Sequence, residues 1–120
     1  MIILDNIRSN SSAEYLAYSE DYPDEQSVGD YILLYGQSYI AERNDTYEIP
    51  AYLPGWFTLG DDGGGTAILM RLDGSPAVYR CGHGAIGSSD PEWVAESFAE
   101  WLAAECPASW MDDDDGYDDN

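Results

Sequence analysis

A glycine-rich acidic loop between two apolar runs limits how this chain can fold more than any other feature. The loop reads Gly60-Asp61-Asp62-Gly63-Gly64-Gly65, and it separates the run 55–59 from the run 66–72. Four glycines in six positions indicate a backbone that needs positive φ angles or that approaches another segment closely. Both flanking runs are typical of strands. We therefore expect a connection between two strands that exposes both carboxylates at its tip.

Further strand signals extend this pair into a meander. The turn Asp73-Gly74-Ser75 leads from the run 66–72 into a returning strand over 77–81. An aromatic and aliphatic run over 31–35 predicts another strand, buried on both faces, and residues 2–4 fit a short one. The sequence predicts a single α+β domain over residues 1–110, in which helices pack on one face of an antiparallel sheet of about four strands.

Three helices are expected around this sheet. Ser11 and Glu14 have the spacing of a capping box, which predicts a short helix over 12–19. Ser38 is expected to begin a second helix that ends near Arg43 or Asp45. The longest helix is predicted over 91–105, with Asp90 as its N-cap. Its apolar stripe comprises Val94, Phe98, Trp101 and Leu102.

Charge is the strongest global constraint on partners. The chain has 24 acidic residues against four arginines and no lysine, for a formal net charge of −20. Such a charge argues against direct binding to nucleic acid or to anionic membranes and favours basic proteins. Adaptation to high salt is an alternative explanation. Residues 111–120 are strongly acidic and predict a disordered tail.

The sequence gives little support for a catalytic or metal site. The glycine loop lacks the lysine of a P-loop and the alternating acids of an EF-hand. Cys81, His83 and Cys106 lack the spacing of a zinc site, and a Cys81–His83 nucleophile pair is the remaining enzymatic alternative. We expect no enzyme, metal or cofactor. The short apolar start and the absence of a long apolar segment predict a cytoplasmic protein with reduced thiols.

The ordered set of motifs from Tyr39 to Leu102 resembles the second half of the SUKH superfamily domain, which includes fungal cell-wall-assembly regulators. The matching features are Tyr47-Glu48, Pro54-Gly55, the strand and loop over 56–65, the Asp73-Gly74 turn, and Ser97-Phe98 followed by Trp101-Leu102. The family's N-terminal Leu-Pro-x-x-Tyr signature is not evident here. Where many members of the family have an acidic stretch after the Val-Tyr strand, this chain has Cys81-Gly82-His83-Gly84.

This resemblance implies binding rather than catalysis, because bacterial SUKH proteins are typically immunity proteins that block a cognate toxin, often a nuclease. A basic toxin domain would suit the net charge. Partner contacts are therefore expected at the acidic loop and near it, and at a surface tryptophan that can anchor an interface. The expected partner-binding residues are Asp61, Asp62, Asp45, Glu48 and Trp93. The alternative is an acidic nucleic-acid mimic or regulatory protein that captures a basic partner.

Overall fold

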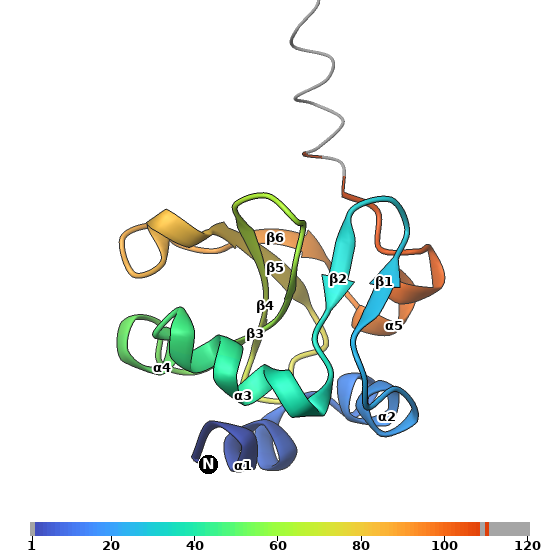
Figure 1. Ribbon diagram of the computed structural model, residues 1–120, viewed down its shortest axis with the longest axis horizontal. Coiled ribbons are helices and arrows are strands. Elements are labelled where there is room, and N and C mark those ends of the chain that lie inside the picture. Colours follow the sequence, from blue (N-terminus) through green and yellow to red (C-terminus); the bar gives the residue numbers. More distant parts are fainter. Residues whose placement is uncertain (1, 109, 111–120) are drawn as a thin grey trace, which may run out of the picture.

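The computed structural model describes residues 2–108 and 110, and within them a six-stranded antiparallel sheet packs against helices (Figure 1). The strands lie in chain order: β1 Gln26–Val28, β2 Ile32–Leu34, β3 Trp56–Asp61, β4 Thr66–Arg71, β5 Val78–Gly82 and β6 Glu92–Ala95. The helices are α1 Ile2–Asn10, α2 Ala13–Asp21, α3 Gln37–Thr46, α4 Ile49–Tyr52 and α5 Phe98–Ala103, with a 3-10 turn, η1, at His83–Ala85. The predicted class is confirmed, with six strands where about four were expected.

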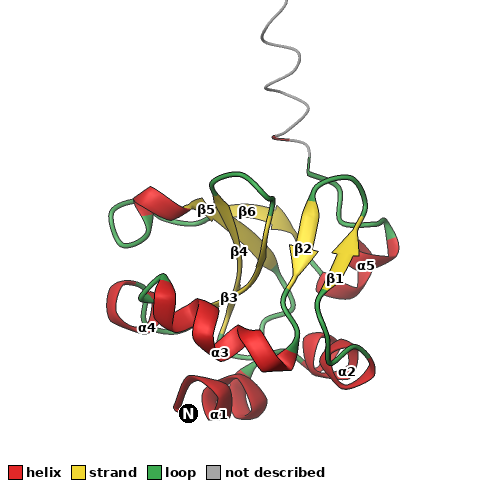
Figure 2. Ribbon diagram, viewed as in Figure 1, coloured by secondary structure: helices red, strands yellow, loops and turns green. Residues whose placement is uncertain are grey.

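Two apolar clusters hold the sheet between its helices. The larger cluster joins one face of the sheet to α1, α2, α3 and α5, and Phe57, Phe98 and Trp101 are among its buried residues. The smaller cluster lies on the other face, where Ile49 of α4 packs on Ala67 and Leu69. Figure 2 shows α1, α2 and α3 gathered along one side of the strands. Most helical packing thus lies on one face, and α4 covers part of the second.

Asn44 of α3 supplies hydrogen bonds that a neighbouring strand would otherwise give to β3. The β2–β3 pairing is limited to Leu33 with Asp61 and Leu34 with Gly60, so the first half of β3 has no strand on that side. There the buried Asn44 side chain accepts from Thr58 N at 2.8 Å and donates to Thr58 O at 3.0 Å. It also donates to Ile40 O at 2.8 Å. Helix α3 has Gly36 as its N-cap in place of the predicted Ser38, and it ends at Thr46, one residue beyond the predicted end near Arg43 or Asp45.

Two predicted elements have a different structure. Residues 2–4 begin helix α1 instead of a strand, because Ile3 and Ile7 fall on one helical face and are buried in the larger core. The helix predicted over 91–105 is strand β6 followed by α5, because the free edge of β5 pairs with residues 92–95. Ser97, and not Asp90, is the N-cap, since its hydroxyl accepts from Glu100 N.

The capping of α2 also differs from the prediction. Ser12 is the N-cap in place of Ser11, and it accepts from Tyr15 N at 3.0 Å. Glu14 does not close a capping box. Its carboxylate accepts from Ser97 Oγ at 2.8 Å and from Ala99 N at 3.0 Å, so it satisfies donors at the start of α5. Glu14 thus ties two helices that are distant in sequence.

None of the described helices is long and apolar enough to cross a membrane. The acidic tail predicted over 111–120 lies outside the described residues.

We predict that Asn44→Ala strongly destabilises the fold. The substitution leaves the buried Thr58 N–H and C=O without their partners, and each such group costs about 1–3 kcal/mol. Urea denaturation should show a free energy of unfolding lower by about 3 kcal/mol. The matched control is Asn6→Ala on the exposed side of α1, which should change stability by less than about 0.5 kcal/mol. Equal effects of the two substitutions would contradict the bridging role of Asn44.

Candidate functional site

The β3–β4 loop is held by hydrogen bonds that its own two carboxylates accept. Asp61 Oδ1 accepts from Gly63 N at 2.9 Å, and its Oδ2 accepts from the hydroxyl of Tyr35 at 2.6 Å. Gly63 has a φ of 77°, and a Cβ at Gly60 would lie 2.3 Å from Leu33 O. Both glycine requirements expected from the sequence, a positive φ and a close backbone approach, are therefore present in this loop.

Asp62 is buried, with 5% of its surface exposed, which corrects the expectation that the loop exposes both carboxylates. Its Oδ1 accepts from Gly64 N at 2.9 Å and from Thr66 N at 3.2 Å, and its Oδ2 accepts from the indole N–H of Trp110 at 3.0 Å. Burial alone would raise the pKa of Asp62, but the hydrogen bonds from Trp110, Gly64 and Thr66 outweigh it and lower the pKa. Asp62 therefore stays ionised and joins the loop to the C-terminal segment.

The ring of His83 lies near the carboxylates of Asp61 and Asp62. It stacks on Tyr47 with ring centroids 4.1 Å apart and planes inclined by 6°. Its Nε2 is buried and has no hydrogen-bond partner among the described residues. Burial lowers the pKa of His83, and the nearby charges of Asp61 and Asp62 oppose that shift without overcoming it. His83 is thus a neutral ring at pH 7.

Exposed carboxylates from α3 continue the acidic surface beyond the loop. Asp45 lies in the last turns of α3, and Glu48 follows in the left-handed conformation, with φ of 55°. Both are exposed and flank Tyr47, whose ring lies on His83. We call Glu42, Asp45, Glu48 and Asp61 the acidic rim. The arginine in this stretch of α3 is Arg43, whose guanidinium carbon lies 5.8 Å from the Tyr35 ring centroid.

Trp93 lies on the same sheet face as the smaller apolar cluster, because it pairs with Tyr79 of that cluster across β5 and β6. Its side chain is 61% exposed. Tyr79 in turn packs edge-on against Trp56, with ring centroids 4.9 Å apart. These three side chains form an aromatic row that ends at Trp93 on the open surface. The expectation that Trp93 is accessible is therefore met.

The cysteines do not form a reactive pair with His83. Cys81 and Cys106 are buried in different apolar clusters, and burial raises the pKa of each thiol, to about 12 for Cys106. A thiol with a raised pKa is a poor nucleophile, because the thiolate is the reacting species. Among the described residues, no group of three or more His, Cys, Asp or Glu side chains could hold a metal ion.

The sequence indicated Asp61 and Asp62 as loop carboxylates but missed the two side chains that hydrogen-bond to them, Tyr35 and Trp110. Tyr35 was assigned to a strand, and it lies just after β2, where its hydroxyl reaches Asp61. The contact between Trp110 and Asp62 joins residues 48 positions apart, and no local spacing signals it.

We predict that Trp110→Phe weakens the attachment of the loop. Phenylalanine keeps an aromatic ring near Arg80, which lies 4.8 Å above the Trp110 ring, but it removes the N–H that satisfies Asp62 Oδ2. The free energy of unfolding should fall by about 1–3 kcal/mol. The control is Trp93→Phe, which removes an exposed indole and should change stability by less than about 0.5 kcal/mol. A Trp110→Phe protein as stable as this control would exclude the role assigned to the indole N–H.

We predict that His83 makes the fold sensitive to mild acid. Because burial lowers its folded pKa, the unfolded state takes up a proton first as the pH falls through the ordinary histidine value of about 6.5. The stability of the wild type should therefore decline between pH 7 and about 5.5 relative to His83→Phe, which keeps a ring on Tyr47. Carboxylate titration contributes to both proteins, so the difference between their urea midpoints isolates His83. A difference between the two urea midpoints that stays constant across this pH range would refute the prediction.

A comparison with curated proteins gave no match. The family model of the SMI1 / KNR4 family (SUKH-1) matches residues 6–104. The match includes the glycine loop, the acidic rim and Trp93, and it extends N-terminally beyond the motifs that suggested the resemblance. The chain therefore belongs to the SMI1/KNR4 family (SUKH-1).

Proposed function

We propose that this protein is an immunity-type binding protein that neutralises a cognate toxin domain by direct contact. Family membership supports a role in this class, since SUKH domains generally serve in immunity or regulation rather than in catalysis. The net charge of −20 favours a basic toxin. Nucleases fit this requirement, because they must approach phosphate groups.

The observation that carries the proposal is the acidic rim together with an exposed tryptophan on the same sheet face. Asp45 and Glu48 belong to a segment that contributes Tyr47 to the smaller cluster, and Trp93 lies on that same sheet face. Exposed charges of this kind steer a basic partner and accelerate association. An exposed tryptophan can then be desolvated at the centre of the interface and slow dissociation.

The five expected residues would have different tasks in this interface. Asp45, Glu48 and Asp61 would provide charge, and Trp93 would be the apolar anchor. Asp62 is buried and is not accessible to a partner, so its contribution would be to maintain the conformation of the loop. Charge reversal at Asp62 would therefore unfold the loop as well as change the charge, and it makes a poor probe of contact.

The test begins with capture of a partner from the native host by the tagged protein at about 150 mM salt, where exposed charges more than roughly 8 Å apart are largely screened. One stoichiometric partner with a basic domain, whose activity is inhibited on binding, is expected. Asp45→Lys plus Glu48→Lys should then slow association about tenfold at low salt. The control pair Asp21→Lys plus Asp24→Lys makes the same charge change at exposed positions around the end of α2 and should slow association far less.

Two results would contradict this proposal. Equal association rates for the two charge-reversed pairs would show that only net charge matters, not the acidic rim. Capture of many unrelated basic proteins that dissociate with added salt would favour the alternative, an acidic mimic or regulator of basic proteins. Trp93→Ala should speed dissociation from the cognate partner, and an unchanged rate would remove Trp93 from the interface.

A further inference from the structure

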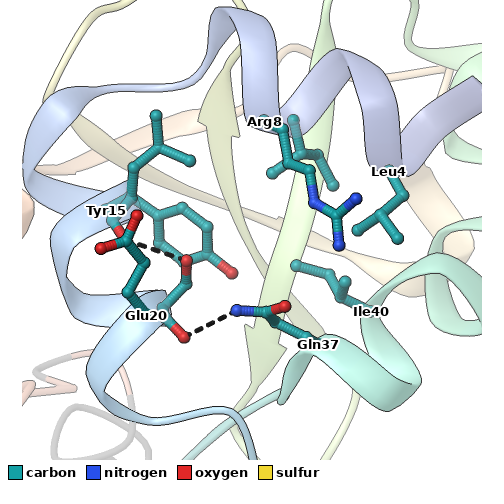
Figure 3. Close-up of a pocket in the computed structure, with 9 residues that line it drawn as sticks. Leu4, Arg8, Tyr15, Glu20, Gln37 and Ile40 are labelled. Carbon is teal, nitrogen blue, oxygen red and sulfur yellow. Dashed lines mark hydrogen bonds between the residues drawn. The ribbon is translucent and has the colours of Figure 1, made fainter.

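A pocket of about 370 Å³ lies between α1, α2 and α3, apart from the acidic rim (Figure 3). This size falls within the range of small-molecule sites. Leu4 and Ile7 from α1, Leu16 from α2 and Ile40 from α3 provide apolar walls. The polar lining residues are Arg8, Tyr15, Ser19, Glu20 and Gln37. An amphipathic lining of this kind suits a small ligand with an apolar body and one polar head.

Tyr15 brings an unpartnered hydroxyl to this pocket. Its side chain is only 3% exposed, and its ring is fixed by edge-on contacts with Phe57 and Phe98 at centroid distances of 5.2 and 5.5 Å. The hydroxyl has no hydrogen bond with any described residue, and Figure 3 shows it turned into the pocket. Burial raises the pKa of Tyr15, so the phenol keeps its proton. Because this hydroxyl opens onto the pocket, a ligand acceptor placed there can hydrogen-bond to it.

Arg8 brings a positive charge to the lining of the same pocket. Arg71 and Arg80 have ion pairs with Asp73 and Glu92, whereas Arg8 and Arg43 form none with the residues that the structure describes. Figure 3 shows the Arg8 guanidinium on the side of the pocket next to Leu4 and Ile40.

The remaining polar groups limit what the head of the ligand can be. Gln37 Nε2 donates to Ser19 O at 2.9 Å, which fixes the amide at the pocket wall. Glu20 also lines the pocket, and its charge repels any anion, an anion with two negative charges more strongly than a monoanion. Guanidinium and hydroxyl donors together match a single carboxylate, which accepts paired hydrogen bonds well.

We propose that this pocket binds a small organic monocarboxylate, with the carboxylate on Arg8 and Tyr15 and the apolar body against Leu4, Ile7, Leu16 and Ile40. The ligand class follows from the donor pair and the apolar walls. The site is distinct from the acidic rim, and its occupancy does not depend on the proposed toxin.

The probe is octanoate, compared with octylamine, which has the same apolar chain and the opposite charge. A protein of charge −20 attracts a cation without any specific site, so preference for the anion must come from local donors. Titration of the full chain, followed by methyl NMR, should give saturable one-to-one binding of octanoate. The shifted methyl groups should be those of Leu4, Ile7, Leu16 and Ile40.

Four variants test the assigned roles. Arg8→Gln should weaken octanoate binding about tenfold or more, and Tyr15→Phe several-fold, because each removes a donor to the carboxylate. The matched control Arg71→Gln makes the same charge change outside the pocket and should leave the affinity unchanged. Glu20→Gln removes a repulsive charge and should bind octanoate more tightly.

The proposal is overturned if octanoate produces no saturable shift at these methyl groups, or if octylamine binds there equally well. It is also overturned if Arg8→Gln and Arg71→Gln have the same affinity, since the carboxylate would then not rest on Arg8. Thermal unfolding of each variant accompanies the titrations. A folded Tyr15→Phe protein with undiminished affinity would likewise exclude the hydroxyl as a ligand.

Discussion

The Asn44 amide takes the place of a missing strand along the first half of β3. The β2–β3 pairing stops after two residue pairs, and the backbone groups of Thr58 would face an apolar interior without partners. One side chain satisfies both groups, and it also bonds to Ile40 O within its own helix. This fixes the position of α3 relative to the central strands. Three of the four acidic-rim residues, the Tyr47 ring that stacks on His83 and one wall of the pocket belong to α3 or to the turn that follows it, so their geometry depends on this bridge.

Local patterns in the sequence predict those elements whose stabilising contacts are close in sequence. The central meander follows from alternating apolar runs and the turns at 60–65 and 73–75, and β3, β4 and β5 lie where these patterns indicate. The segment 91–105 was mispredicted because its apolar stripe also fits a helix. Pairing with the free edge of β5 decides the outcome, and it is a tertiary effect. The Ser97–Glu100 spacing is a local signal of the true helix start that the longer stripe obscured.

In the candidate site, too, the sequence predicts local features but not contacts between distant residues. The glycine loop marks Asp61 and Asp62, but the sequence does not distinguish their environments. Asp61 is half-buried at the end of β3, whereas Asp62 is enclosed by loop amides and by Trp110, which arrives from the other end of the chain. The spacing of two adjacent acids says nothing about which one is satisfied internally. Only the folded arrangement shows that Asp61 is bound by Gly63 and Tyr35 and remains half-buried, whereas Asp62 is enclosed.

Helix α3 connects the two surfaces for which binding is proposed. Gln37 and Ile40 in its first turns line the pocket with α1 and α2, and Asp45 near its end belongs to the acidic rim. The helix has only ten residues and no side-chain N-cap, so its own propensity contributes little to its stability. Packing at Ile40 and the Asn44 bridge hold it in place instead. Because those contacts lie between the two surfaces, the pocket and the acidic rim share a rigid support although their side chains and their expected ligands differ.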